Sequence, residues 1–452
     1  MASDSGPNKP LIRANTGVQD ALLHNPSQSP FAYQAPMTCA NFIAEQVIFR
    51  PLNFNGMAGQ KVQFSLTKQA DLVGPINLVT VFKPLTQPSP SPPQSYNGNV
   101  GAIRYINNLG IGQIDSARIL YGSNVICHCL PEWLYIRYRK YLNTEAAHAW
   151  RVLSKMDQTL SERNAFARIG GEVITNLCVP WGDDTSQYFS MCGMADALRI
   201  EVNFKPLKNL LNYDVSDNLD ADRQLFGNDT PAIYQDINLL ADCIHLTGAE
   251  RDVVVANIKS PNGQPKLVED VQAHIRVLIP AQASAFTYRL KLTNITGPVT
   301  SIFWYLEDPL NTQGTQKDTR FGGDYPHYPE PGLNRQWDYY YMVSGGNTII
   351  PRTSSLRSRF HNHVKWFSGA HPGEYINAYS FSTAPEITNA SYGTLNFGQL
   401  DYPELIISFP AGLLNNYDPL HPGTSQGAYL NVVADTRNFF HEQGGDFTKT
   451  FY

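Results

Sequence analysis

Most of this chain is divided into short runs of β-branched and aromatic residues, each bounded by glycine, proline, asparagine or aspartate. The pattern begins near Cys39, and runs of this length and composition predict β-strands. In 197–204 apolar and polar residues alternate, which places the apolar side chains on one face of a strand. The chain is therefore expected to be all-β. Strands are expected at 47–49, 62–66, 76–82, 119–121, 197–204, 253–258, 271–278, 286–292, 302–306, 364–367, 375–381, 405–409 and 430–435.

Two kinds of segment interrupt the strands. Across 131–166, apolar residues recur at steps of three and four, which predicts amphipathic helices laid over a sheet. A break is expected near Asn143, because Thr144 can cap the helix that follows. The proline-dense stretch within 83–103 and the Gly-, Pro-, Asn- and Tyr-rich residues 308–338 are expected to form long loops with functional or interfacial roles.

Length and composition divide the chain into parts. At 452 residues it is too long for one ordinary core, so two or three domains are expected. Residues 1–35 contain few large apolar side chains and are expected to form a flexible N-terminal arm. An acidic, apolar-poor stretch at 207–233 is expected to link a first domain at 36–206 to a second at 234–452.

A weak internal repeat suggests that the two domains share one fold. Gly74-Pro75-Ile76 and Gly297-Pro298-Val299 each precede an apolar strand, at an offset of 297 − 74 = 223. Residues 200–204 are similar to 405–409, at an offset of 409 − 204 = 205. Both offsets are close to half the chain length, and their difference is the size of a loop insertion.

The composition favours a protein that contacts other proteins. Charged residues make up 16% and aromatic residues 12% of the chain, and the buried centres of protein interfaces are likewise poor in charge and rich in aromatics. A monomer with a large β core could have the same composition. The formal net charge of −5 argues against a protein that wraps nucleic acid, because such proteins need a basic face.

The cysteines and the N-terminus indicate a reducing compartment, in the cytosol or the nucleus. The N-terminus lacks the basic and apolar regions of a signal peptide, and no apolar stretch is long enough to span a membrane. The sequons at Asn228, Asn294 and Asn389 are therefore expected to be unused. The cysteines are expected to be free thiols, since their spacing completes no zinc site: Cys39, Cys127, Cys129, Cys178, Cys192 and Cys243.

Few residues suggest chemistry. His361 and His363 would share one face of a strand, with His327 and His371 in the same half, and a metal could use such a pair. Because no carboxylate or cysteine lies at ligand spacing, ordinary strand or interface histidines are the favoured interpretation. The glycine pairs 170–171 and 345–346 lack the phosphate-binding patterns and are expected to be turns. The sequence therefore predicts no catalytic, metal or cofactor residue, and no enzyme.

Tyrosines and a tryptophan cluster at 337–341, in the sequence Trp-Asp-Tyr-Tyr-Tyr. Such a cluster could stack on a sugar or pack within protein, and the low overall charge favours protein contact or core. A carbohydrate-active β-sandwich, either a lectin or a glycoside hydrolase, is the alternative from another functional class. It would need paired carboxylates at a groove, and none stand out.

The segment 371–397 contains two short aromatic-rich strands joined by a polar turn. It resembles the C-terminal signature of the major capsid proteins of large nucleocytoplasmic double-stranded DNA viruses, such as iridoviruses, phycodnaviruses and marseilleviruses. In that family a Gly-x-Tyr-x-Tyr-Ser-Phe strand is followed by a proline, a Ser/Gly turn and an Asn-Phe-Ser-like strand. The matching residues are Gly373, Tyr375, Tyr379, Ser380, Phe381, Pro385, Ser391, Gly393, Asn396 and Phe397, with looser spacing after Tyr375.

Further blocks resemble the family in family order, from about residue 45 to 435. Val179-Pro180-Trp181 is similar to its Val-Pro-Leu strand, although the Pro-Phe-Trp-Phe continuation is absent. The other blocks are Asp71-Leu72-Val73, the stretch from Tyr105 to Gly122, Glu132-Trp133-Leu134, and the stretch from Gly297 to Trp304.

The resemblance implies two consecutive eight-stranded antiparallel jelly rolls, with the helical excursion in the first and long loops between strands. It also implies a structural protein of the virion, assembled in the host cytoplasm, whose homotrimers are pseudo-hexagonal capsomers of an icosahedral shell. Implied partners are neighbouring capsomers, minor capsid and penton proteins and the membrane-associated layer inside the shell, with no direct contact to nucleic acid.

Overall fold

The computed structural model describes residues 42–66, 69–85, 104–142, 144–181, 185–212, 232–260, 264–273, 276–280, 282, 284–307, 337–367, 376–387, 392–411, 428–443 and 446–449. Residues from Ile43 onward form one compact unit. The expected arm at 1–35 lies outside the described residues, as do most of the 207–233 stretch and most of both expected long loops. Among the described helices, none is both long enough and apolar enough to cross a membrane.

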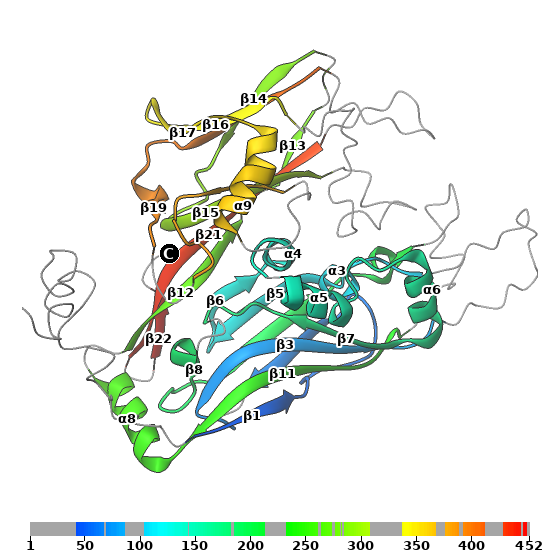
Figure 1. The fold of residues 1–452 in the computed structure, drawn as a ribbon. Coiled ribbons are helices and arrows are strands. Elements are labelled where there is room, and N and C mark those ends of the chain that lie inside the picture. The colour runs from blue at the N-terminus through cyan, green and yellow to red at the C-terminus, as the bar shows by residue number, and fades with distance from the viewer. Residues whose placement is uncertain are drawn as a thin grey trace, which may run out of the picture. The chain divides into compact units, whose positions relative to one another are not determined.

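The first barrel consists of two antiparallel sheets of short strands (Figure 1). One sheet has the order β1 (Phe42–Phe49), β11 (Tyr234–Leu246), β3 (Leu72–Phe82) and β7 (Gly171–Asn176), with β8 (Phe189–Ser190) also paired to β3. The other has the order β2 (Lys61–Leu66), β9 (Leu198–Phe204), β5 (Ile114–Tyr121) and β6 (Asn124–Cys129). A small ladder joins β4 (Arg104–Tyr105) to β10 (Leu211–Asn212).

The second barrel repeats this arrangement. Its first sheet has the order β12 (Gln264–Ala273), β21 (Ala428–Gln443), β15 (Pro298–Glu307) and β18 (Asn377–Ser380), extended by β13 (Val277–Ile279), β19 (Leu395–Asn396) and β22 (Asp446–Lys449). Its second sheet has the order β14 (Phe286–Lys291), β20 (Glu404–Phe409), β16 (Tyr339–Ser344) and β17 (Asn347–Ser354). Each barrel thus pairs two four-stranded ladders, which confirms the expected all-β fold with two eight-stranded jelly rolls.

The strand orders also confirm the internal repeat. Gly74-Pro75-Ile76 lies in β3 and Pro298-Val299 lies in β15, and each of these strands is third in its own sheet. The similar segments at 200–204 and 405–409 lie in β9 and β20, the second strands of the other two sheets. The resemblance seen in the sequence therefore reflects equivalent positions in two copies of one fold.

The strand pairing places the boundary between the barrels further along the chain than the expected stretch 207–233. β11 lies beyond the 207–233 stretch, yet it pairs with β3 along nearly its whole length, from Tyr234 opposite Phe82 to Ile244 opposite Leu72. A first barrel that ends near Leu246 fits this pairing, whereas a boundary at 233 would remove one of its central strands.

Helices cover the first barrel where the 3.6-residue pattern predicted them. They are α4 (Pro131–Lys140), α5 (Thr144–Leu153) and α6 (Leu160–Ile169), with the short α3 (Leu109–Gly112) beside them. Helix α6 begins with a capping box, in which the Thr159 side chain accepts from the Glu162 backbone and Glu162 accepts from the Thr159 backbone. Short 3₁₀ turns lie at Thr185–Gln187, Leu207–Asn209 and Phe397–Gln399.

Two expected strands are helical, and these expectations were wrong. Residues 253–258 lie in α8 (Gly248–Lys259), where Val254 and Ile258 are one turn apart and pack on the core while Val253 is exposed. Residues 364–366 belong to a helical segment formed by a π-helix at Arg357–His361 and α9 (Asn362–Trp366). In both cases β-branched residues suggested a strand, but packing selected the helix.

Candidate functional site: the seam between the two barrels

The sheet β12–β21–β15–β18 of the second barrel is buried on both of its faces. Along β15, Ile302, Trp304 and Leu306 belong to the core of the second barrel, whereas Phe303 and Tyr305 belong to a core shared with the first. All five side chains are at most 1% exposed. Successive residues of a strand point to opposite faces, so this sheet fills its own barrel and also forms an interface with the other. We call that interface the seam.

Aromatic side chains from both barrels meet across the seam. Trp133 lies in helix α4 and Tyr141 lies just after it. Their rings are 5.9 Å and 6.1 Å from the ring of Phe303. Tyr141 also lies 5.4 Å from the ring of Phe367. These tilted arrangements are favoured by the ring quadrupoles, so the rings contribute orientation as well as buried area.

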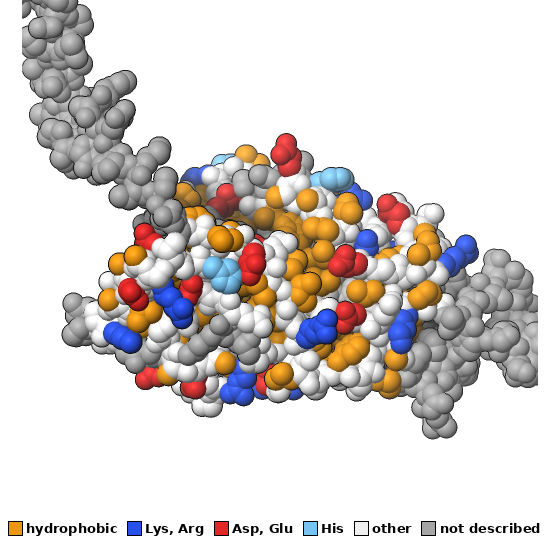
Figure 2. Space-filling model, turned by 90° about the horizontal axis from the view of Figure 1, so that it is seen from below, with side chains coloured by type: hydrophobic (Ala, Val, Ile, Leu, Met, Phe, Trp, Pro, Cys, Tyr) orange, Lys and Arg blue, Asp and Glu red, His pale blue; other side chains and the backbone are white. Residues whose placement is uncertain are grey.

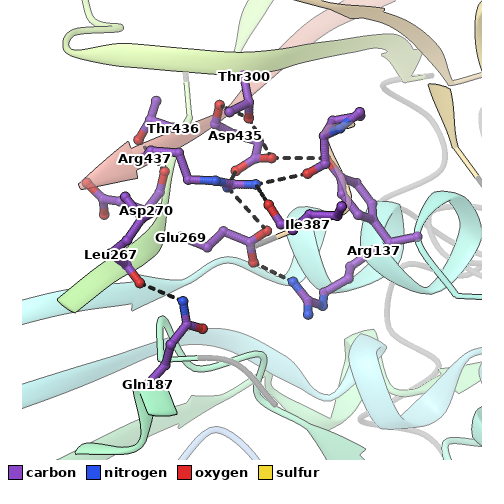
Figure 3. A network of polar contacts seen from close by, with 12 residues as sticks. Arg137, Gln187, Leu267, Glu269, Asp270, Thr300, Ile387, Asp435, Thr436 and Arg437 are labelled. Carbon is purple, nitrogen blue, oxygen red and sulfur yellow. Dashed lines mark hydrogen bonds and ion pairs between the residues drawn. The ribbon is translucent and has the colours of Figure 1, made fainter. Parts of the chain in front are cut away.

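Buried charges lie beside these rings (Figure 3). Arg137 of α4 pairs with Glu269 of β12, and this ion pair joins the two barrels. Arg437 of β21 donates to Asp435 Oδ1 at 2.8 Å and lies 3.8 Å from the other Glu269 oxygen. Arg437, Asp435 and Glu269 are at most 4% exposed. Two guanidinium groups therefore balance two carboxylates in a largely buried space, where an unpaired charge would be costly.

Neutral donors complete the environment of Asp435. The Thr300 hydroxyl donates to Asp435 Oδ2 at 2.8 Å, and the Tyr141 hydroxyl donates to the same oxygen at 3.0 Å. Burial raises the pKa of Asp435 to about 6, although Arg437 acts in the opposite direction. Burial and the neighbouring Asp435 hold the pKa of Tyr141 well above its usual value, so this hydroxyl remains a donor.

A second buried ion pair, formed within the sheet of the second barrel, lies against β8 of the first barrel. Lys266 of β12 lies 3.1 Å from Glu442 Oε1 and donates to the Ser190 hydroxyl at 3.0 Å. The Ser190 backbone N–H donates to the same Glu442 oxygen at 3.0 Å. Phe189, next along β8, lies 5.4 Å from the ring of Phe447. The two polar clusters fix the seam at separate points, the first by an ion pair between the barrels and the second by hydrogen bonds to Ser190.

The described part of the signature segment 371–397 lies against this sheet. β18 and β19 both pair with β15, so the two signature strands add to one side of the doubly buried sheet. Arg437 donates its other nitrogen to the backbone oxygens of Pro385, at 2.9 Å, and Ile387. The turn that contains the signature proline is thereby tied to the charges of the seam.

The aromatic residues of the signature pack with one another. Tyr379 lies 5.2 Å from the rings of both Trp366 and Phe381, and Phe381 lies 5.9 Å from Phe397. Burial raises the pKa of Tyr379. These contacts give the signature residues a packing role. Gly373, Tyr375 and Ser391 lie outside the described residues.

The structure separates the histidine pair that suggested a metal site. His361 ends the π-helix and is exposed, whereas His363 lies in α9, is buried and stacks on Phe367 at 6.3 Å. Residues two apart on a helix point to different sides, so the expected shared face does not exist. His327 and His371 lie outside the described residues, among which no group of three or more histidine, cysteine or acidic side chains could hold a metal.

The remaining candidate residues are structural. Trp337 and Tyr340 are fully buried in the core of the second barrel, while Tyr339 and Tyr341 stack on each other at 6.2 Å. Gly345 and Gly346 have φ of +53° and +84° and form the two-residue turn between β16 and β17, as expected of a type I′ hairpin. The described cysteines are free thiols.

No known family model matches the sequence, and no curated protein is significantly similar to it. Solved structures match along nearly the whole chain. VP54 of the virus PBCV-1 matches with a TM-score of 0.68 at 14% identity, covering 93% of this chain and 100% of that one. A chain of the PBCV-1 capsid gives 0.67 at 15% identity, with the same coverage. The Faustovirus major capsid protein gives 0.64 at 10% identity, covering 95% and 96%.

These similarities and the strand order define the class of the molecule: it has the double jelly-roll fold found in viral major capsid proteins. The match takes in both barrels, because it covers nearly all of both chains. At 10–15% identity the agreement concerns the fold.

Proposed function

We propose that this chain is a major capsid protein, which acts by self-assembly rather than by catalysis. The observation that supports this most strongly is the agreement of the whole two-barrel architecture with the Faustovirus major capsid protein, over 95% of this chain and 96% of that one. The doubly buried seam supports the same role, because it makes the two barrels one rigid building block.

The proposed assembly is a homotrimer whose six barrels form a pseudo-hexagonal capsomer, and many capsomers tile an icosahedral shell in the virion. The interfaces of such an obligate trimer bury roughly 2,000–5,000 Å² each. The arm at 1–35 would contact neighbouring capsomers or minor proteins beneath the shell. Penton proteins and the membrane-associated layer inside the shell are further proposed partners, and the host cytoplasm is the proposed place of assembly.

The purified full-length protein tests this proposal. We expect sedimentation velocity to give three times the monomer mass, and electron micrographs to show particles with a hexagonal outline. A protein that stays monomeric at all accessible concentrations, or a particle of another outline, would count against a capsid role.

A carbohydrate-active β-sandwich is not supported by the similarities found. Its aromatic candidates, Trp337 and Tyr340, are fully buried and cannot stack on a sugar. A glycan-binding screen of the trimer and the monomer would check this directly, and we expect no binding that depends on Tyr339 or Tyr341.

A further inference from the structure

The helical segment 355–366 on the second barrel has a polar face toward the protein and an apolar face toward solvent. Its inward face is polar: Ser358 donates to the Ser355 oxygen at 2.8 Å, and Asn362 donates to the Ala378 oxygen at 2.9 Å. Ala378 lies in β18, the last strand of its sheet, so the helix covers a strand edge. A polar inward face is what such an edge requires, because its backbone groups need partners.

The outward face of the same segment is apolar. Val364 is 76% exposed and Leu356 is 50% exposed, with the half-buried Phe360 between them in the sequence. The spacing of four residues is that of neighbours along one side of a helix. The inward face is already committed to β18. The exposed apolar residues therefore have no role within the subunit, and a stripe of this kind marks an interaction surface.

Positive charge surrounds this apolar stripe. Residues 339–373 contain four lysines and arginines and no acidic residue, in a chain of net charge −5. Arg357 and Lys365 are exposed on the segment itself, whereas Arg352 lies before it in β17 and stacks on the Tyr339 ring. The surface that docks here should accordingly be apolar and acidic.

The first barrel carries such a surface. The four strands β1, β11, β3 and β7 contain no lysine or arginine, and three carboxylates face outward, at Glu172, Asp236 and Asp242, whereas Glu45 pairs with His245. Asp236 and Glu172 lie directly opposite Val81 on its two neighbouring strands.

Apolar side chains lie between these carboxylates. They are the exposed Ile48 and the half-buried Val79, Val81, Ile174 and Leu240. Figure 2 views the molecule from the side on which β1 and β11 lie in Figure 1, and it shows hydrophobic side chains exposed among scattered charges.

Symmetry explains how the two surfaces would meet. In a closed ring of three two-barrel subunits, the second barrel of each copy lies beside the first barrel of the next, so every contact joins two different surfaces. We propose that the apolar, basic face of segment 355–366 docks on the outer face of the β1–β11–β3–β7 sheet of a second copy. This inference rests on the proposed function and names the contact that closes the trimer.

Val364→Asp tests the helix side of this contact. The side chain is exposed in the subunit, so folding is retained, but an added carboxylate would face the acidic sheet. We expect the concentration at which half of the trimer dissociates to rise by about tenfold or more, measured by sedimentation velocity. Val253→Asp is the matched control, since Val253 is 57% exposed on helix α8, and it should leave the trimer unchanged.

A charge exchange tests whether the two surfaces meet each other. Arg357→Glu with Lys365→Glu should weaken the trimer, and Glu172→Lys with Asp236→Lys should weaken it similarly. In a ring of three copies, a mixture of the two double variants always places two like copies side by side, so at least one contact stays mismatched. In the protein that carries all four changes, every contact again joins opposite charges. We expect it to recover most of the trimer stability at low salt, and the recovery to diminish at high salt.

The outcomes separate this inference from the proposed function. A wild-type protein that forms no trimer sinks the proposed function itself. A trimer that forms normally with Val364→Asp, or a four-fold variant that is weaker than either double variant, overturns only the docking inference. Wild-type protein that binds anionic phosphatidylserine vesicles through Arg357 and Lys365, with an unaffected trimer, would likewise overturn it and assign the face to a membrane.

Discussion

The sheets β1–β11–β3–β7 and β12–β21–β15–β18 hold equivalent positions in the two barrels, yet only the second is buried on both faces. Along β11 buried and half-exposed residues alternate, as in a sheet with one open face. Along β21 burial is nearly continuous from Ala428 to Asn438. One copy of the fold therefore keeps an open outer face, while the other uses that face to join the two barrels.

The difference shows how a repeated fold acquires an interior seam. The outward face of β21 did not simply become apolar, because it carries Asp435 and Arg437, and Glu442 follows further along the strand. These charges are satisfied by one another and by Glu269, Arg137 and Lys266. Buried ion pairs contribute little net stability, but a displaced partner is heavily penalised, so they favour one relative placement of the surfaces they join.

The largest effect should come from breaking this charge balance. Arg437→Ala leaves Asp435 and Glu269 without a buried partner and removes the hydrogen bonds to Pro385 and Ile387. We expect the free energy of unfolding to fall by about 3–5 kcal/mol near pH 8, measured by guanidinium denaturation. The double variant Arg437→Met with Asp435→Leu should recover part of the loss. An unchanged stability for Arg437→Ala would mean that water reaches the seam.

A comparison of outward-facing residues on equivalent strands should give the next largest effect. Phe303→Ala on β15 removes a fully buried ring that touches Trp133, Tyr141 and Phe367, so we expect a loss of about 3–4 kcal/mol. Val79→Ala on β3 removes a half-buried side chain and should cost about 1 kcal/mol. Equal losses at the two positions, by thermal or chemical unfolding of the subunit, would contradict the difference between the sheets.

The pH dependence of the free energy of unfolding should reveal the raised pKa of Asp435. Its pKa is raised in the folded protein to about 6, so folding binds a proton that the unfolded chain releases above its ordinary pKa of 3.8. The resulting stabilisation is complete below pH 3.8 and is lost as the pH rises through 6. We expect the wild-type protein to lose about 2–3 kcal/mol relative to Asp435→Asn over this range. A constant difference between the two proteins across the range would argue that Asp435 stays ionised.

The smallest effect should appear on the open sheet. Asp242 of β11 is half-exposed and accepts a hydrogen bond from Gln46 at 3.0 Å. Asp242→Ala should change the free energy of unfolding by less than about 0.5 kcal/mol, because an exposed polar contact competes with water. A loss as large as that of Arg437→Ala would show that this face is as constrained as the seam.

The fold could be predicted from the sequence where side-chain periodicity decides the structure. The alternation in 197–204 predicted β9, and steps of three and four predicted the helices over 131–166. Helix α8 was missed because a run of three valines has strand composition, while the choice of helix depends on packing of Val254 and Ile258 that the local sequence does not contain. The pairing of β11 with β3 was missed because it spans the 207–233 stretch.

The seam could not be predicted, because its contacts join residues far apart in the sequence. Arg137 and Glu269 are 132 residues apart, and Tyr141 and Asp435 are 294 apart. The local pattern is misleading, because Asp435 and Arg437 lie two residues apart as on a solvent-facing strand, whereas both are buried. The expected strand ended at 435 and so did not include Arg437.

Strand β21 also sets the order in which the molecule can be completed. It lies inside the doubly buried sheet, between β12 and β15, and among the described strands only β22 follows it in the chain. During synthesis the first barrel can close early, but the second barrel and the seam must wait until β21 has left the ribosome, after every other described strand except β22. A chain released too soon would lack the strand that joins both barrels. Such a chain would have a closed first barrel with no completed second barrel beside it.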